Sequence, residues 1–207
     1  MKLTLIDFDN WERREHYLHF IKEVRCSYSV CVNLNISNLN GQRLYPAMLW
    51  LLTRTVNEMP EFRTSLTEDG LGYYSEMHPA YTVFNPDAKT FSGIWTAYQP
   101  DYLSFLRGYE EDVGKYSSTT QYEAKPGRPA NSFDVSMIPW FSFTAFNLNI
   151  FGDGTYLLPL FTVGKTFEEN GKTMLSLAIQ VHHAVCDGYH VGKFIETLQA
   201  NINKFDA

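Results

Sequence analysis

The chain has 207 residues, of which 17 are basic and 23 acidic, and the resulting formal charge of −6 argues against nucleic acid as the main partner, because phosphate binding needs a clustered basic excess. A 44% hydrophobic content suffices for a substantial core, so that we expect one domain over residues 1–207. The three cysteines, the absence of a signal-peptide pattern and the lack of a ~20-residue apolar run predict a cytoplasmic protein that does not enter membranes.

The N-terminal quarter predicts two helices separated by a strand. Asp9 as N-cap, with Glu12 three residues later, predicts a helix that runs to about Val24. Alternating apolar residues predict a strand over residues 27–36. A second helix is predicted over residues 46–59, with Pro46 in its first turn, and it is apolar around most of its circumference and so should be deeply buried.

The middle of the chain predicts short strands, a helix and a polar loop. Residues 81–84 and 91–95 have strand character, and apolar residues at helical spacing predict a helix over residues 101–116. Residues 114–131 are polar and rich in Pro and Gly, which is typical of a functional or mobile loop or of a plain surface crossing. Residues 133–150 then predict one or two strands with a bend at Pro139.

The last third predicts a hairpin followed by a helix. Strand patterns over residues 156–165 and 172–183 are joined by Asn170-Gly171, a strong hairpin signal. Apolar residues at 3-and-4 spacing after Gly188 predict a C-terminal amphipathic helix. Helices and strands interspersed in this way indicate an α/β or α+β fold.

The most informative segment is His182-His183-Ala184-Val185-Cys186-Asp187-Gly188, where a predicted strand runs into a predicted helix. Two adjacent histidines on a strand point to opposite faces, so they cannot chelate one metal, and the helical zinc-protease pattern is absent. Cys186 stands beside an aspartate that would raise its pKa, which favours a buried, inert thiol. His183 is therefore either a general base, whose imidazole titrates near neutral pH, or a core histidine satisfied by hydrogen bonds.

The pattern His-His-x-x-x-Asp-Gly resembles the motif of acyl-CoA-dependent acyltransferases, and the longer sequence resembles chloramphenicol acetyltransferases of the classical trimeric type. Dihydrolipoyl acyltransferase cores and condensation domains share the short motif, but the longer match extends over essentially the whole chain. Its segments are residues 11–16, 44–48, 61–63, 81–84, 90–92, 135–140, 146–149, 159–165 and 180–190. The resemblance implies an α/β fold, namely the two-layer mixed-sheet sandwich of CoA-dependent acyltransferases.

The resemblance also implies a mechanism. His183 corresponds to the base that removes a proton from the acceptor hydroxyl, and Ser136 to the serine that stabilises the oxyanion. Asp187 corresponds to an aspartate that forms an architectural ion pair with Arg13, for which we expect bidentate geometry. Gly188 is expected to permit the turn that aims His183. The co-substrate would be acetyl-CoA, with no metal, and the assembly a homotrimer with active sites between subunits.

Two sets of binding residues follow from the same resemblance. The expected acceptor-binding residues are Phe20, Val24, Cys26, Tyr28, Phe91, Phe146, Leu148, Leu160 and Thr162. The expected CoA-binding residues are Arg43, Tyr45, Trp140 and Lys165. Two positions depart from the family pattern, because Phe20 and Thr166 each replace a tyrosine, the first at the acceptor and the second near CoA.

Three hypotheses follow. The first is O-acetylation of chloramphenicol, which would give antibiotic resistance. The second keeps the chemistry but changes the acceptor to another hydroxylated small molecule. The third is a catalytically silent binding protein on the same scaffold, against which the intact His183, Ser136, Asp187 and Arg13 argue. A dihydrolipoyl acyltransferase would normally carry lipoyl domains on Ala/Pro-rich linkers, and these 207 residues contain none.

Overall fold

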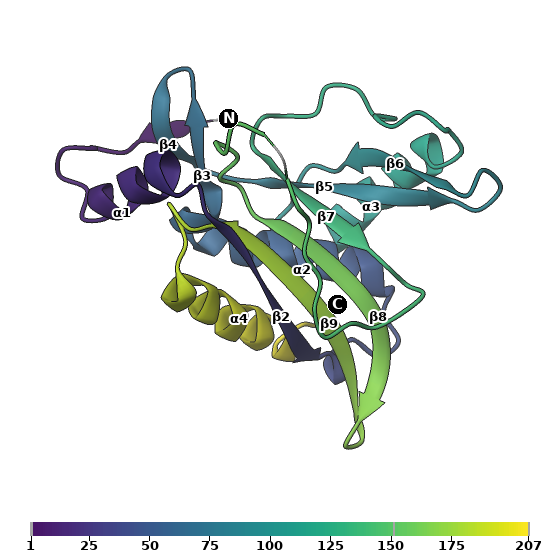
Figure 1. Ribbon diagram of the computed structural model, residues 1–207. Coiled ribbons are helices and arrows are strands. Elements are labelled where there is room, and N and C mark those ends of the chain that lie inside the picture. Colours follow the sequence, from purple (N-terminus) through teal and green to yellow (C-terminus); the bar gives the residue numbers. More distant parts are fainter. Residues whose placement is uncertain (1, 151, 207) are drawn as a thin grey trace.

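The computed structural model, which describes residues 2–150 and 152–206, has a mixed α/β fold built on a six-stranded sheet with the order β2-β9-β8-β7-β5-β6 (Figure 1). Its strands are β2 (Ser27–Asn35), β5 (His78–Asn85), β6 (Thr90–Trp95), β7 (Ser132–Met137), β8 (Leu160–Glu169) and β9 (Lys172–His182). Strand β7 runs parallel to both of its neighbours, and the other pairs are antiparallel. The sheet is therefore mixed, as the α/β prediction requires.

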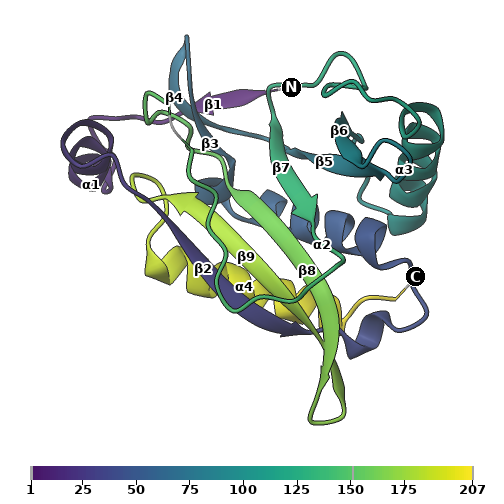
Figure 2. The ribbon, with the colours of Figure 1, turned by 45° about the vertical axis from the view of Figure 1, so that its right-hand side comes forward.

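A smaller sheet and four α-helices complete the fold. The smaller sheet has the order β1-β4-β3, with β1 (Leu3–Leu5), β3 (Thr64–Thr67) and β4 (Gly70–Tyr74). The helices are α1 (Arg14–Leu18), α2 (Leu44–Glu58), α3 (Tyr102–Tyr116) and α4 (Gly188–Asn203). One π-helical turn (His19–Glu23) and two 3-10 turns (Ser37–Leu39 and Pro60–Arg63) connect them. Helices α2 and α4 lie behind β8 and β9 in both views (Figures 1 and 2).

Helix α2 is central to the core. Ten of its fifteen residues are buried, as the apolar circumference of the segment predicts. Aromatic side chains continue the core toward α4, where Phe194 stacks on Phe62 with centroids 4.4 Å apart and on Phe161 with centroids 5.3 Å apart. The resulting layer of helices supports the face of β8 and β9, the strands that lead to the histidine motif.

Several predicted elements are confirmed. The helix predicted over residues 101–116 forms as α3, and Asp101 caps it by accepting a hydrogen bond from the Ser104 amide. Asn170 and Gly171 have φ values of 53° and 72°, which suits the tight turn between β8 and β9. The C-terminal helix begins at Gly188, the last residue of the motif. Among the described residues, no helix has the length and apolar character needed to cross a bilayer.

Other boundaries differ from the predictions. The first helix begins at Arg14 and not after Asp9, and Asp9 does not cap it. Trp11 packs against Phe8 and Tyr17 instead, with centroids 6.2 and 5.7 Å away, so aromatic contacts shape the preceding segment as turns. The strand predicted over residues 133–150 ends at Met137, and β8 begins at Leu160 instead of residue 156.

Candidate active site

His183 follows directly on β9 and is fixed from both sides. Its amide donates to the carbonyl of Cys26 at 2.8 Å, which extends the pairing of β2 with β9 by one step. The carbonyl of His182 then accepts from the amides of Val185 and Cys186, at 3.1 and 3.0 Å, and so closes a tight turn. Because the strand, the hydrogen-bonded turn and the helix are directly consecutive, the backbone at His183 has little freedom to move.

Asp187 ends the turn and starts α4. Its carboxylate accepts from the amides of Tyr189 and His190, at 3.0 and 3.4 Å, and is thus a helix N-cap. The imidazole of His190 accepts in return from the Asp187 amide at 3.2 Å, which completes a capping box. His190 Nε2 also lies 3.8 Å from a carboxylate oxygen of Glu61. The support that His190 and Glu61 give to the turn was not predicted, although a polar side chain three residues after an N-cap is a recognisable signal.

Arg13 holds the turn from the side of α1. Its guanidinium donates to the carbonyl of His183 at 2.9 Å, to the carbonyl of Ala184 at 3.1 Å and to the carboxylate of Asp187 at 2.7 Å. The predicted pair with Asp187 therefore forms, but the prediction of bidentate geometry is wrong, because the other two donors go to the backbone. This arrangement ties His183 and two residues that follow it in the turn, Ala184 and Asp187, to one rigid cation.

The ion pair affects the titration of Asp187. Burial acts to raise the pKa of this carboxyl, but the hydrogen bond from Arg13, the nearby His190 imidazole and the charge of Arg13 together outweigh it and lower the pKa to about 2. Asp187 is thus ionised at neutral pH and remains a partner for Arg13. At the adjacent Cys186 burial prevails and raises the pKa of the thiol strongly. This agrees with the expectation of an inert cysteine.

Gly188 does not have the backbone role that was predicted for it. Its φ lies outside the left-handed region, and an added Cβ would meet no atom of the described residues within 4 Å. The turn is set by the Asp187 cap and the Arg13 contacts instead. Within this chain, nothing in the local geometry of Gly188 requires a glycine.

The imidazole of His183 lies among aromatic rings. Phe20 stacks on it with a centroid distance of 4.0 Å and an interplanar angle of 4°, and the Tyr28 ring is 5.2 Å away at 58°. His183 Nδ1 is buried and has no hydrogen-bond partner among the described residues. Neighbouring His182 is 3% exposed, and burial lowers its pKa, which favours a neutral structural side chain. Of the two histidines, His183 is therefore the one whose ring has a buried nitrogen without a hydrogen-bond partner among the described residues.

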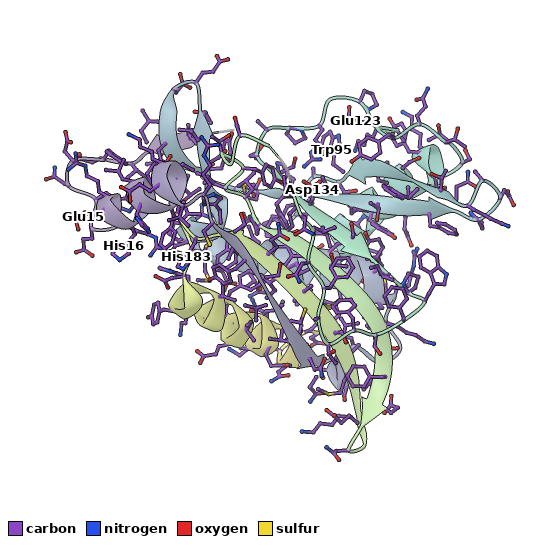
Figure 3. The ribbon with its side chains drawn as sticks, viewed as in Figure 1. Glu15, His16, Trp95, Glu123, Asp134 and His183 are labelled. Carbon is purple, nitrogen blue, oxygen red and sulfur yellow. The ribbon has the colours of Figure 1, made fainter. Side chains whose placement is uncertain are left out.

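Ser136 belongs to a different part of the molecule. It lies on β7 and lines a cavity of about 510 Å³ between β5, α3 and the loop after β7. In Figure 3, His183 lies near α1, which carries Glu15 and His16, whereas Asp134 of β7 lies toward the β5 side. His183 is not among the described residues that line the Ser136 cavity. The two candidate catalytic groups are therefore not brought together within one chain.

The expected acceptor residues divide between these two places. Phe20 and Tyr28 pack on His183, Cys26 contacts it through its carbonyl, and Val24 is 53% exposed on the same side. The remaining residues lie on the Ser136 side. Phe91, Phe146, Leu148 and Thr162 line its cavity, and Leu160 lines an adjoining cavity of about 420 Å³ that also includes Ser136. Each side thus holds part of the expected binding surface.

The expected CoA residues lie near the Ser136 cavity to different degrees. Tyr45 and Trp140 line it, but the Tyr45 hydroxyl already donates toward the Thr82 and Val135 carbonyls, at 3.2 and 3.3 Å. Arg43 is exposed, pairs with Glu110 and lies over the ring of Tyr109, a lining residue that was not predicted because its helical spacing is typical of core. Lys165 is exposed and its amide bonds to the Phe141 carbonyl.

The fold is shared with solved acetyltransferase structures. A solved structure described as chloramphenicol acetyltransferase matches 97% of this chain and 100% of its own length with a TM-score of 0.88 at 20% identity. The dihydrolipoamide acetyltransferase of Azotobacter vinelandii matches 99% of this chain and 97% of its own length with a TM-score of 0.67 at 18% identity. At these identities the likeness shows the fold alone.

Sequence comparison identifies the family. The model of the chloramphenicol acetyltransferase family matches residues 1–199. The chloramphenicol acetyltransferase of Campylobacter coli is 48% identical over 207 residues, which cover 99% of this chain and 100% of the relative, and one from Clostridium perfringens is 44% identical over 213 residues, covering 100% and 97%. The chain belongs to the chloramphenicol acetyltransferase family.

Proposed function

We propose that this chain transfers the acetyl group of acetyl-CoA to a hydroxyl of chloramphenicol, directly, in a ternary complex. His183 Nε2 takes the proton of the hydroxyl, and the oxygen attacks the thioester carbonyl carbon. The C–S bond of the tetrahedral intermediate then breaks, and the thiolate of CoA receives the proton from the imidazolium. The products are an acetyl ester and free CoA, so that atoms and charge balance without a metal.

The observation that carries this proposal is the three-donor contact of Arg13. A general base must point at its substrate within hydrogen-bond reach, and a displaced ring loses most of its effect. Arg13 fixes the carbonyls of His183 and Ala184 and the carboxylate of Asp187 at once. Phe20 then restricts the rotation of the His183 imidazole by stacking on its face. Such rigid support suits a positioned base better than a core histidine with satisfied nitrogens.

Ser136 supplies the second group that the reaction requires. The tetrahedral intermediate bears a negative oxygen, and a hydroxyl aimed at it stabilises the transition state more than the ground state. Ser136 lines a cavity with an apolar wall, where water competes poorly with such a donor. Trp140 and Tyr45 in the same wall would contact CoA through their rings, while Arg43 and Lys165 offer cations to its phosphates.

We further propose that the complete site forms between two copies of this chain, as in the homotrimer that the family resemblance implies. His183 and Ser136 lie in separate parts of one chain, and some of the apolar side chains on each side are exposed. Val24 is 53% exposed on one side, and Phe91 and Leu148 are 47% and 42% exposed on the other. A neighbouring copy would cover both surfaces and bring Ser136 opposite His183.

The primary test is release of the CoA thiol from acetyl-CoA in the presence of chloramphenicol, against a reaction without acceptor. The wild-type chain should show acceptor-dependent release, and His183→Ala should abolish it. His16→Ala, which removes an exposed histidine on α1, is the matched control and should remain active. Retained turnover in His183→Ala would contradict the assignment of the base, and a silent wild type would favour a binding protein.

The shared site has its own test. His183→Ala and Ser136→Ala chains are co-expressed with two different tags, and trimers that contain both are purified. Each of these mixed trimers has one interface of three in which an intact His183 faces an intact Ser136, so about a third of the wild-type activity should return. If both groups came from the same chain, mixing would restore nothing.

One observation favours a second candidate for the acceptor, namely another hydroxylated small molecule. Phe20, which stacks on the base, lacks the hydroxyl that the family pattern has at this position, so one polar contact to chloramphenicol is missing. Another hydroxylated small molecule could fit the same chemistry. A panel of such acceptors in the same thiol-release assay distinguishes the two, since the true acceptor gives the higher kcat/KM.

A further inference from the structure

Two unpaired polar atoms lie on neighbouring rings in the candidate active site. Among the described residues, four buried side-chain atoms lack a hydrogen-bond partner, and two of them are His183 Nδ1 and the Tyr28 hydroxyl oxygen. The two rings have centroids 5.2 Å apart. Buried polar groups are almost always paired, so two adjacent exceptions suggest a bond that is made only in another state of the site.

Strand pairing is the reason that Tyr28 lies beside His183. Tyr28 of β2 is opposite Val181 of β9, Ser27 is opposite His182, and the amide of His183 bonds to Cys26. The phenol is therefore held against the imidazole by the ladder itself. Because Phe20 covers a face of the imidazole, a partner for Nδ1 must approach along the ring edge. The tilt of 58° between the Tyr28 and His183 rings is compatible with an edge approach.

Each backbone carbonyl close to His183 already accepts at least one hydrogen bond. The His183 carbonyl accepts from Arg13 at 2.9 Å, the Ala184 carbonyl accepts from Arg13 at 3.1 Å, and the Cys26 carbonyl accepts from the His183 amide at 2.8 Å. The phenol oxygen of Tyr28, by contrast, takes part in no hydrogen bond among the described residues, so an Nδ1–H donor would meet no competing partner there. The imidazole needs such a partner, since a base with a free Nε2 must carry its proton on Nδ1.

We propose that Tyr28 is a positioning residue for His183: when substrates close the site, its hydroxyl oxygen accepts a hydrogen bond from Nδ1–H and so keeps Nε2 free to act as the base. This inference rests on the proposed role of His183. Catalytic hydrogen bonds are often long in ligand-free structures and shorten in the substrate complex. Burial raises the pKa of Tyr28 to about 12, so the phenol stays neutral and available at any assay pH near neutrality.

The role differs from that of an apolar pocket wall. A wall contributes area, and Tyr28→Phe would leave that area almost unchanged. An orienting hydroxyl instead determines which imidazole nitrogen holds the proton, and the wrong tautomer cannot accept the substrate proton at Nε2. Tyr28→Phe therefore separates the two roles, because it removes one oxygen and keeps the ring.

The test is a ¹⁵N NMR spectrum of histidine-labelled protein with acetyl-CoA analogue and acceptor bound, with His183 assigned by comparison with His183→Gln. Wild type should show His183 as the Nδ1–H tautomer, and Tyr28→Phe should show a mixture of tautomers. The kcat of Tyr28→Phe should fall roughly 3- to 10-fold, which corresponds to the loss of one neutral hydrogen bond, with little change in KM. Tyr102→Phe is the matched control, because it removes another buried, unpaired hydroxyl, far along the chain on α3.

Three results would overturn the proposal: an Nε2–H tautomer at His183 in the wild type, an unchanged tautomer in Tyr28→Phe, or the same change in Tyr102→Phe. The first needs no variant, so the proposal remains testable even if Tyr28→Phe does not fold. The spectra with the same ligands do not depend on turnover. A protein that binds the acetyl-CoA analogue and the acceptor but transfers no acetyl group would contradict the proposed function. The tautomer comparison would still decide the role of Tyr28.

Discussion

Arg13 and Asp187 are separated by 174 positions in the chain, yet Arg13 Nη1 lies 2.7 Å from the Asp187 carboxylate. The same guanidinium also reaches the carbonyls of His183 and Ala184. A contact between the two ends of the sequence thus determines the conformation of the turn that bears the candidate base.

Arg13→Lys should lower both activity and stability although it keeps the charge. Lysine can pair with Asp187 as a point charge, but it cannot donate in three fixed directions. Losing the donors to the two carbonyls should cost about 1–3 kcal/mol of unfolding free energy and reduce kcat more than KM. Urea unfolding and steady-state kinetics measure both, with the exposed neighbour Arg14→Lys as control. Equal effects in the two variants would contradict the special role of Arg13.

The Asp187 ion pair should stabilise the protein at neutral pH and lose its effect in acid. The folded pKa, about 2, is lower than the ~3.9 of an unperturbed aspartate, so folding favours the ionised form. The contribution is complete above about pH 4 and declines as the pH falls toward about 2. The difference in Tm between wild type and Asp187→Asn should therefore shrink over this interval. A difference that stays constant between pH 6 and pH 2 would refute the assignment.

Ser136→Ala should reduce kcat by about 10²–10³-fold and leave the KM of both substrates nearly unchanged. The reason is that the hydroxyl acts on the oxyanion, which exists only after attack has begun. Steady-state kinetics with chloramphenicol and acetyl-CoA measure the effect, and Ser118→Ala, in the exposed segment after α3, is the control. A change confined to KM would show that Ser136 binds substrate and does not stabilise the oxyanion.

Phe20→Ala should impair His183 by releasing its ring. The two rings stack at 4.0 Å, and an aromatic pair of this kind contributes about 0.5–1.5 kcal/mol beyond the area it buries. We expect kcat to fall about 3- to 10-fold, whereas Phe20→Tyr keeps the stack and should retain activity. Circular dichroism establishes that the variants are folded. If Phe20→Leu, which fills space without stacking, matched wild type, packing alone would explain the contact.

Cys186 should resist alkylation in the native protein. It is 1% exposed, and burial raises its pKa, so the thiolate that reacts with iodoacetamide is scarce. Cys26 and Cys31 are half-buried and should react first. Peptide mass spectrometry after native labelling measures this order, and labelling in urea is the control in which all three react. Early modification of Cys186 would show that the turn opens readily.

Local signals in the sequence were enough to predict much of the fold. Helices α2 and α3 and the Asn170-Gly171 turn follow from short-range patterns, and the structure contains each of them. The predicted start of α1 was wrong, because aromatic packing of Trp11 with Phe8 and Tyr17 overrides the capping pattern at Asp9. A pattern that spans four residues does not contain tertiary contacts of this kind.

The site was predicted residue by residue only in part. The pairing of Arg13 with Asp187 came from the family resemblance, and the structure adds the backbone contacts that no spacing rule gives. The capping role of His190 and the position of Tyr109 in a cavity wall depend on how elements pack. The family resemblance implied a site between subunits, but the residue types alone do not say that His183 and Ser136 lie apart in one chain, because that depends on the topology.

The edge position of β2 has a consequence for synthesis. This strand is made early, but in the six-stranded sheet it pairs only with β9, from Ser27 opposite His182 to Asn35 opposite Met174. A growing polypeptide must therefore keep an apolar ribbon without a neighbour until nearly all of it has left the ribosome. We expect nascent chains to depend on chaperones for solubility, and premature stop codons anywhere before β9 to yield aggregates instead of partly active fragments.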